Sequence, residues 1–298
     1  MTAQSPTKRN LPRISFEFFP PKTPRASMAL WESVQRLAPL APEFVSVTYG
    51  AGGTTRDRTM SAILAIRDCA RLNVAGHLTC VGATRAEVLK VASNYAMLGC
   101  HRIVALRGDP PTGQNRFEPH PDGFAGAVDL VAALSDLNQF DIWVAAYPEL
   151  HPEATSQQAD IDHLKRKLDA GATGAITQLF FENETFYRFR DACAAAGITA
   201  PIVPGILPIE DFSKTVRFAD SCGATVPKWM FKAFGNAGDD ASHDLLSIAI
   251  ATEQCDELMS HGVNDLHFYT LNKSELVFQV CRALGIEPQP AQIAAGCG

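Results

Sequence analysis

The chain has 298 residues, of which 46% are apolar and 19% are charged. This balance is typical of a globular protein and argues against disordered, collagen-like and coiled-coil classes. The 32 acidic residues exceed the 26 basic ones and give a formal net charge of −6. Nucleic acid is therefore not an expected partner, because proteins that track phosphate backbones carry a broad basic surface.

The N-terminal residues and the cysteines indicate a cytoplasmic protein. The segment Met1–Asn10 carries two cations with no apolar stretch behind them, unlike a secretory signal. No later run approaches the roughly 20 apolar residues that cross a bilayer. The eight cysteines form no Cys-x-x-Cys pair, which is typical of reduced thiols and disfavours a thiolate zinc site. We therefore predict no membrane partner and no bound metal.

Eight short runs rich in β-branched and aromatic residues alternate with amphipathic helical stretches. The predicted strands are Ile14–Phe18, Phe44–Tyr49, Val74–Thr79, Arg102–Arg107, Asp141–Ala146, Gly174–Phe180, Ile202–Gly205 and Leu266–Tyr269. Most of them start roughly 27 to 39 residues apart, the length of a strand-helix repeat. The pattern predicts an α/β fold, a (β/α)₈ barrel of the TIM type. The last interval is about twice as long, so we expect extra helix before the last strand.

An open, doubly wound sheet is the weaker alternative, since it has the same alternation of strands and helices. The chain contains no Gly-x-Gly-x-x-Gly sequence, so a Rossmann dinucleotide site is not indicated. We expect a disordered tail over residues 1–12 and a single barrel domain over residues 13–298. Pro110–Pro121 is expected to be a long loop.

Helix ends support this phasing. Left-handed caps are expected at Gly99, Gly171 and Gly197, each of which precedes a predicted strand. A further helix is predicted to begin with a capping box formed by Thr155 and Gln158. Its apolar face contains Ile161, Leu164 and Leu168, and another stripe contains Asp160, His163 and Lys167. From the pattern alone, that polar stripe is best interpreted as a face in solvent.

Polar residues occur where a barrel strand points inward. Side chains alternate along a strand, and Phe16 and Phe18 suit the helix side, which leaves Ser15 and Glu17 facing the interior. The same argument predicts further inward side chains, namely Ser46, Thr48, His77, Thr79, Arg107 and Gln178. Most lie near the C-terminal ends of their strands, where barrels of this kind build their active sites.

Six polar residues are expected to meet at that end of the barrel. They are Glu17, Thr48, His77, Arg107, Asp109 and Gln178. A buried ion pair, such as Glu17 with Arg107, explains one member as well as function does. Six together favour a polar ligand, because each unpaired buried group costs on the order of a few kcal/mol. No His-Glu-x-x-His, P-loop or Gly-x-Ser-x-Gly sequence is present, and the residues alone leave the reaction class open.

A series of short motifs runs along nearly the whole chain, beginning with Ser15–Lys22 (SFEFFPPK). The others are Phe44–Gly50, Arg56–Thr59, His77–Cys80, Ala105–Asp109, Val144–Ala154, Leu164–Lys167, Ala175–Gln178, Pro204–Pro208 and His267–Asn272. Each motif is modest alone, but together and in this order they are specific. The sequence resembles the methylenetetrahydrofolate reductase family, and its length is similar to the single-domain bacterial form.

This resemblance implies a barrel that binds FAD noncovalently and takes hydride from NADH or NADPH. The reduced enzyme would convert 5,10-methylenetetrahydrofolate to 5-methyltetrahydrofolate, in one-carbon and methionine metabolism. Nicotinamide and folate would use the same flavin face in turn, so ping-pong kinetics are expected. Homo-oligomers are usual in this family, and we expect one here.

The resemblance also implies roles for individual residues. Glu17 matches the general acid, and Asp109 matches a residue that contacts the pterin and tunes the flavin. The implied flavin-binding residues are Tyr49, Ala51, His77, Arg107, Gly108, Asp109, Tyr147, His151, Ala154, Asp160, His163, Arg166 and Lys167. The implied folate or nicotinamide contacts are Thr48, Gln178, Lys214, Phe218 and Lys273.

Four of these residues carry a further physical expectation. Lys214 and Lys273 stand where relatives carry Gln and Arg, and a lysine cannot reproduce the two-pronged contact of an arginine. From its sequence context alone, Phe218 reads as a helix-core residue. Glu17 is expected to have a pKa raised by desolvation, which would keep it protonated near neutral pH.

Two other functions are compatible with parts of the pattern. A flavin barrel of the proline dehydrogenase type also lacks a Rossmann motif, but it does not explain Glu17 together with Arg107–Asp109. A folate- or flavin-binding protein without turnover would not need an internal acid.

Overall fold

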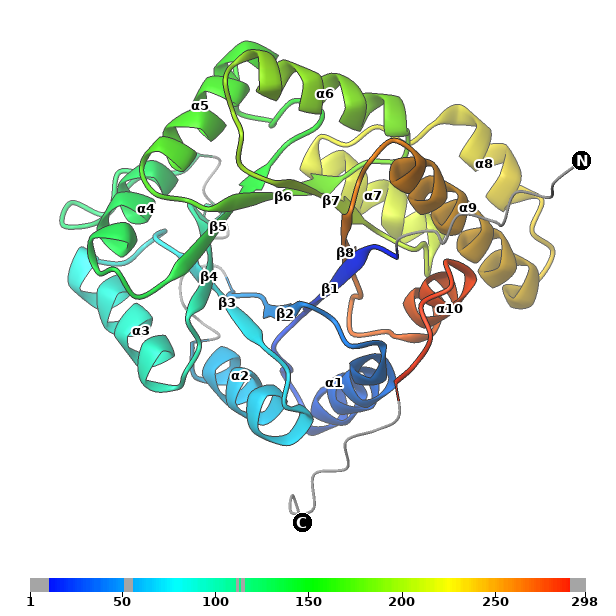
Figure 1. Ribbon diagram of the computed structural model, residues 1–298, viewed down its shortest axis with the longest axis horizontal. Coiled ribbons are helices and arrows are strands. Elements are labelled where there is room, and N and C mark those ends of the chain that lie inside the picture. The colour runs from blue at the N-terminus through cyan, green and yellow to red at the C-terminus, as the bar shows by residue number, and fades with distance from the viewer. Residues whose placement is uncertain (1–10, 51–55, 111–112, 114–115, 290–298) are drawn as a thin grey trace, which may run out of the picture.

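The computed structural model describes residues 11–50, 56–110, 113 and 116–289. Within them, eight parallel strands close into a barrel in chain order, and β8 pairs with β1 (Figure 1). The strands are β1 Arg13–Phe18, β2 Phe44–Val47, β3 Val74–Thr79, β4 Arg102–Leu106, β5 Asp141–Ala146, β6 Gly174–Leu179, β7 Ile202–Ile206 and β8 Asp265–Tyr269. The predicted (β/α)₈ barrel is confirmed, and the strand ends differ by at most two residues.

Helices surround the barrel on all sides (Figure 1). They are α1 Pro24–Leu37, the 3-10 helix η1 Ala38–Leu40, α2 Arg56–Ala70, α3 Arg85–Met97, α4 Ala127–Asp136, α5 Gln157–Asp169, α6 Asn183–Ala195, α7 Phe212–Cys222, α8 Lys228–Gly235, α9 Asp240–Ser260 and α10 Glu275–Ala283. The extra helix expected before the last strand is present, because α7, α8 and α9 all lie between β7 and β8. No helix in the described ranges has the length and apolarity needed to cross a membrane.

Two apolar layers follow from the alternation of side chains along the strands. Outward residues such as Phe16 and Phe18 pack with the helices in the main core. A smaller cluster fills the barrel interior and contains Phe44, Ala75, Val104 and Ile176. Because these four side chains point into the barrel, every second residue along β2, β3, β4 and β6 from each of them also points inward. They therefore show which polar side chains face the interior.

Helix ends agree with the predictions at three glycines and differ at α5. Gly99, Gly171 and Gly197 all have positive φ angles of 70°, 118° and 78°. The predicted capping box at the start of α5 is wrong by one residue. Ser156 is the N-cap, and its hydroxyl accepts a hydrogen bond from the backbone N–H of Ala159. Ser156 is followed three residues later by alanine, so the cap lacks the reciprocal side-chain bond of a capping box.

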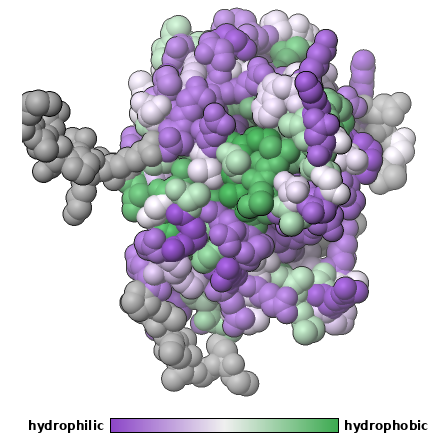
Figure 2. Space-filling model, turned by 90° about the vertical axis from the view of Figure 1, so that its right-hand side faces the viewer, coloured by the Kyte–Doolittle hydropathy of each residue, from purple (hydrophilic) through white to green (hydrophobic). Residues whose placement is uncertain are grey.

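The face formed by α8, α9 and α10 carries a gathering of apolar side chains (Figure 2). Phe231 and Trp229 on α8 are about half exposed, and Leu245 on α9 is more so. Apolar groups gathered on a surface in this way are typical of contact sites.

Gly76 on β3 has no room for a side chain. A Cβ atom at this position would lie 2.5 Å from Cε2 of Tyr95, which is fully buried on α3. The Tyr95 hydroxyl donates a hydrogen bond to the backbone carbonyl of His77, 2.9 Å away. Close packing of α3 on β3 therefore fixes the backbone next to an inward polar residue.

We predict that Gly76→Ala lowers the free energy of unfolding by about 1–3 kcal/mol, since the added methyl group overpacks this contact. Gly238→Ala is the matched control, because nothing lies within 4 Å of its Cβ position. Urea unfolding of both variants measures the effect. Equal midpoints for Gly76→Ala and the parent chain would contradict it.

Candidate functional site

Glu17 lies inside the barrel between two imidazole rings. Its register partners are Ser46 on β2 and Tyr269 on β8. Its Oε2 atom is 3.3 Å from Nε2 of His77 and 3.8 Å from Nε2 of His267. The Glu17 side chain is 15% exposed, so it reaches the mouth of the barrel while both rings are buried. We call Glu17, His77 and His267 the acid cluster.

The charge state of Glu17 differs from the sequence expectation. Burial raises its pKa, but the attraction of His77 and hydrogen bonding and attraction from His267 outweigh burial and lower the pKa to about 2. The expectation of a raised pKa is therefore wrong for this structure. The desolvation argument was sound, but it omitted the two imidazole partners, whose hydrogen bonds and attraction favour the carboxylate form.

His267 was not predicted as a site residue, although the pattern of β8 contains the signal. Leu266 and Phe268 pack outward in the main core, so His267 must face inward. Its Nδ1 atom lies 2.7 Å from the Ser15 hydroxyl, and its ring stacks on Phe44 at 5.9 Å. His267 is fully buried, and closure of the barrel between β8 and β1 brings it to Glu17.

Tyr269 is a second residue that the sequence analysis missed. Its hydroxyl donates a hydrogen bond to the Thr177 carbonyl, 2.6 Å away. Burial and the neighbouring Glu17 charge raise its pKa well above the usual value. An electrostatic interaction with Tyr147 also raises it, which places Tyr269 between the acid cluster and the Tyr147 side of the mouth.

Arg107 does not point into the barrel as predicted. Val104 and Leu106 face inward on β4, so the following residue has the opposite parity. The Arg107 guanidinium instead forms a two-pronged ion pair with Glu153, with Nη2 to Oε1 at 2.9 Å, and lies over the Phe117 ring. The alternative pairing of Arg107 with Glu17 is also wrong.

The residues after Arg107 turn sharply across the mouth. Gly108 has a φ of +88°, and a Cβ atom there would lie 2.6 Å from Val81, so glycine is required. Asp109 follows and is exposed. Burial and the nearby Asp109 carboxylate raise the pKa of Tyr147 to about 12, which places Asp109 beside the end of β5.

The loop between β5 and α5 arranges three predicted residues. The rings of Tyr147 and His151 meet edge to face at 4.5 Å. The ring Nδ1 of His151 accepts a hydrogen bond from the backbone N–H of Glu153. The backbone N–H of His151 donates to the Asp160 carboxylate. Burial lowers the pKa of His151, so the ring favours its neutral form. Ala154 closes the turn through its N–H, which donates to the His151 carbonyl.

The polar stripe of α5 faces the barrel rather than solvent, contrary to the expectation from its pattern. Lys167 is 6% exposed, and its Nζ donates to the Ala145 carbonyl. Burial lowers the pKa of Lys167 to about 8. Burial and the charges of Lys167 and Arg166 lower the pKa of His163 to about 4, so its Nδ1 accepts from Arg166 at 3.1 Å. The long side chain of Lys167 reaches from α5 to the backbone of β5, and helix periodicity alone does not predict this contact.

These residues make one side of the mouth suitable for an anion. Arg107, Arg166 and Lys167 supply three cations around His163, against the carboxylates of Glu153 and Asp160. The Lys167 ammonium donates to a neutral carbonyl rather than to a carboxylate, so its charge is available to a ligand. The donor set fits a diphosphate. Among the described residues, no group of three His, Cys, Asp or Glu side chains could hold a metal ion.

Other predicted residues lie at the rim without contacts to the acid cluster. The Thr48 N–H donates to the Phe18 carbonyl, and the Tyr49 hydroxyl accepts from Arg56. The Gln178 side chain accepts from the N–H of Leu179. Ala51 lies outside the described residues.

The predicted substrate contacts near α7 are on the surface. Lys214 pairs with Asp211 at 2.9 Å, and Lys273 pairs with Glu210 at 3.1 Å. Phe218 is 41% exposed, so its interpretation as a helix-core residue is wrong. An exposed aromatic ring on a helix near the mouth is free to cover a ligand.

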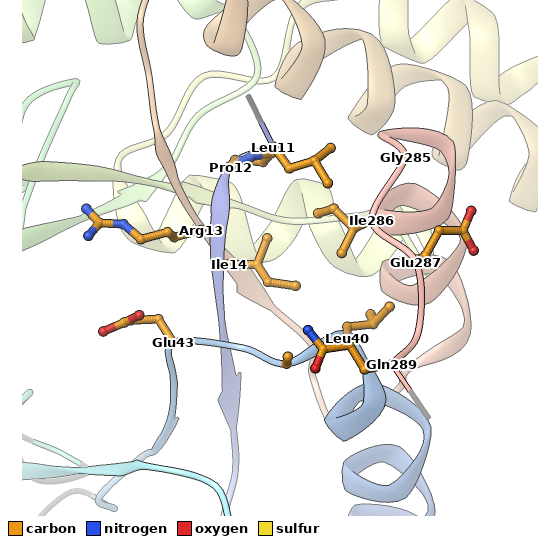
Figure 3. A pocket seen from close by; sticks show the side chains of 11 residues that line it. Leu11, Pro12, Arg13, Ile14, Leu40, Glu43, Gly285, Ile286, Glu287 and Gln289 are labelled. Carbon is orange, nitrogen blue, oxygen red and sulfur yellow. The ribbon is translucent and has the colours of Figure 1, made fainter. Parts of the chain in front are cut away.

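A separate cavity of about 360 Å³ lies at the opposite end of the barrel. Leu11, Ile14 and Ile286 converge on it, whereas Arg13 and Glu43 lie to one side (Figure 3). This cavity is at the N-terminal ends of the strands. In barrels of this kind, residues at that end contribute to stability, whereas the active site lies at the C-terminal ends.

Comparison with known proteins places the chain among folate enzymes. The family model described as methylenetetrahydrofolate reductase matches residues 3–285. The chain is 48% identical to the 5,10-methylenetetrahydrofolate reductase of Escherichia coli, over 92% of this chain and 91% of that protein. It is 36% identical to methylenetetrahydrofolate reductase (NADH) 1 of Arabidopsis thaliana, over 95% of this chain and 50% of that protein.

A solved structure shares the fold at low identity. It is a Clostridium thermocellum protein described as binding two copies of 5-methyl-5,6,7,8-tetrahydrofolic acid. The TM-score is 0.58 at 16% identity, covering 93% of this chain and 96% of that one. That likeness concerns the fold alone, whereas the family match and the bacterial and plant relatives concern the sequence itself. The chain therefore belongs to the methylenetetrahydrofolate reductase family.

Proposed function

We propose that this chain reduces 5,10-methylenetetrahydrofolate to 5-methyltetrahydrofolate with NADH or NADPH, using noncovalent FAD and ping-pong kinetics. Membership of the family supports the reaction. The observation that carries it in the structure is the acid cluster, in which Glu17 reaches the mouth between two buried imidazoles. A mouth that only bound a ligand would not need a proton donor of this kind.

The chemistry explains why an acid is needed. The methylene bridge must open to an iminium before it accepts hydride, and opening requires a proton on the departing nitrogen. We propose that Glu17 delivers that proton from the end of β1. His77 and His267 both face the same Glu17 oxygen, at 3.3 Å and 3.8 Å, so the three groups titrate as a coupled set.

Bound FAD would supply the chemistry of hydride transfer between nicotinamide and folate. We propose that Lys167, Arg166 and Arg107 hold its diphosphate, since these cations surround one side of the mouth. Asp160 and neutral His163 suit ribose hydroxyls, because the Asp160 carboxylate accepts hydrogen bonds and His163, whose Nδ1 accepts from Arg166, donates through Nε2. The remaining flavin contacts would come from Tyr49, Ala51, His77, Gly108, Asp109, Tyr147, His151 and Ala154.

The substrate contacts are also proposals. Asp109 is exposed at the mouth and suits a pterin donor edge, and its charge would lower the flavin reduction potential. Thr48 and Gln178 would contact nicotinamide or folate, and Phe218 would cover the bound ring. Lys214 and Lys273 would meet the glutamate tail, which must compete with Asp211 and Glu210.

The alternative functions are less well supported. A proline dehydrogenase does not account for the family match over residues 3–285. A binding protein without turnover does not account for a carboxylate held between two imidazoles.

We propose a cytoplasmic homo-oligomer, with the exposed apolar side chains on α8 and α9 at an interface (Figure 2). Seven described cysteines are free thiols, in keeping with a reducing compartment. Sedimentation equilibrium of the purified chain measures the assembly.

We predict that Glu17→Gln separates the two half-reactions. Reoxidation of the reduced flavin by methylenetetrahydrofolate should slow by at least about 10²-fold, because the amide cannot donate the proton. Flavin reduction by NADH should stay within about twofold, since that step does not use this acid. Anaerobic stopped-flow absorbance measures both rates. Glu43→Gln, an exposed glutamate at the other end of the barrel, is the control. Full folate turnover in Glu17→Gln would sink the assignment.

We predict that Lys167→Met weakens FAD binding by about 10- to 100-fold, the loss expected for one charge-assisted hydrogen bond. In the parent chain, FAD affinity should fall as the pH rises through about 8, because Lys167 then loses the charge that attracts the diphosphate. The variant should lack this pH dependence. Fluorescence titration of flavin-free protein measures both effects. Lys165→Met, on the exposed side of α5, is the control, and equal affinities for the two variants would refute the role.

A further inference from the structure

The ladder between β6 and β7 is interrupted near the mouth of the barrel. Ile176 pairs with Val203. The next pair along the two strands is Leu179 with Gly205, so β6 has one residue more than β7 between these pairs. An extra residue of this kind is a β-bulge, and bulges beside active sites re-aim a side chain. Gln178 lies at this bulge, and it is one of the proposed contacts of nicotinamide or folate.

The bulge changes the partners of the backbone groups around it. In an unbroken parallel ladder with this register, the Gly205 N–H would donate to the Thr177 carbonyl. It donates instead to the Thr177 hydroxyl, 2.9 Å away. The Tyr269 hydroxyl donates to the Thr177 carbonyl at 2.6 Å. On the other side of the bulge, the Leu179 N–H donates to Oε1 of Gln178 at 2.9 Å.

Tyr269 reaches β6 by crossing β7 at a glycine. Strand β7 lies between β6 and β8 in the barrel, so the tyrosine and the bulge are on strands that do not pair with each other. A Cβ atom on Gly205 would lie 2.5 Å from Cε2 of Tyr269 and would overlap the Thr177 carbonyl. The absence of a side chain at Gly205 therefore leaves the space in which the tyrosine meets that carbonyl.

The Tyr269 hydroxyl is committed to this contact. A phenol has one proton to donate, and the Thr177 carbonyl takes it, so Tyr269 does not also donate to Glu17. Burial and the nearby Glu17 charge raise the pKa of Tyr269 well above the usual value, so the phenol keeps its proton at physiological pH. The contact with His267 is between the two rings, which are nearly perpendicular at 5.5 Å. The hydroxyl therefore supports β6 rather than the acid cluster.

We propose that Tyr269 is a positioning residue that holds the β6 bulge and so directs Gln178 toward the substrate. This role rests on the proposed function. The Thr177 carbonyl and the Gln178 N–H belong to one planar peptide unit, so a bond that fixes the carbonyl also fixes the backbone at Gln178. Because Oε1 of Gln178 accepts from the Leu179 N–H, its amide nitrogen is left to donate to an acceptor on the ligand.

The first test removes one oxygen atom, in Tyr269→Phe. Anaerobic stopped-flow absorbance of flavin reoxidation, at a series of methylenetetrahydrofolate concentrations, gives a half-saturating concentration and a limiting rate. We expect the half-saturating concentration to rise by about 3- to 10-fold, the loss expected for one hydrogen bond, and the limiting rate to stay within about twofold. A parent half-saturating concentration, or a loss confined to the limiting rate, would overturn the proposal.

The matched control is Tyr187→Phe on α6. Tyr187 is also buried, but its hydroxyl makes no hydrogen bond within the part of the chain that the structure describes. This variant should keep the half-saturating concentration of the parent chain.

A double-mutant cycle separates positioning from a general loss of stability. In a Gln178→Ala background, Tyr269→Phe should raise the half-saturating concentration by less than about twofold, since the side chain that it directs is gone. Thr177→Val removes the hydroxyl that accepts from Gly205 and should behave in the same way, so it takes the place of Tyr269→Phe if that variant does not fold. Equal factors in the two backgrounds would show that Tyr269 does not act through Gln178.

The last measurement does not depend on activity. Hydrogen–deuterium exchange, followed by mass spectrometry of peptides that cover β6, reports the protection of the Leu179 N–H. We expect exchange about 3- to 10-fold faster in Tyr269→Phe than in the parent chain or in Tyr187→Phe, because the bulge is then held less firmly. Unchanged exchange would contradict the proposal. If the folate does not reoxidise the parent flavin, the proposed function fails, whereas the exchange still reports whether Tyr269 holds the bulge.

Discussion

The contact between the Glu17 carboxylate and two buried imidazoles is the interaction on which the chemistry of this barrel depends. A carboxylate inside a protein needs compensating partners, since transfer out of water disfavours its charge. The partners come from β3 and from β8, which is about as far from β1 in sequence as the chain allows. Only closure of the barrel, with β8 paired to β1, brings His267 to Glu17. The acid cluster therefore forms only when the barrel is closed.

The mouth divides into two sides with different electrostatics. Strands β1, β3 and β8 carry the acid cluster, whereas the β4 and β5 loops and α5 carry Arg107, Arg166 and Lys167. Tyr269 and Tyr147 lie between them, and the charges of Glu17 and Asp109 raise their pKa values. This arrangement separates a cationic surface that suits a diphosphate from an acid that suits a folate nitrogen.

Alternation along the strands predicted most of the architecture and part of the site. Eight strands, three glycine caps and the inward direction of Glu17 and His77 all follow from local patterns. Arg107 was misplaced because its parity was not counted from Val104 and Leu106, which face inward on the same strand. The burial of Lys167 and the low pKa of Glu17 could not be predicted, because both depend on neighbours from distant segments. The same argument from alternating side chains that located Glu17 would also have located His267.

The most direct test of the account is an anaerobic visible spectrum of the purified chain. We expect a flavin band that bleaches when NADH is added and returns when methylenetetrahydrofolate follows. Return of the band requires both the cationic side, which holds the cofactor, and the acid cluster, which opens the folate bridge. A band that bleaches but ignores the folate would contradict the role of the acid cluster. A colourless protein that cannot take up FAD would contradict the account of the cationic side.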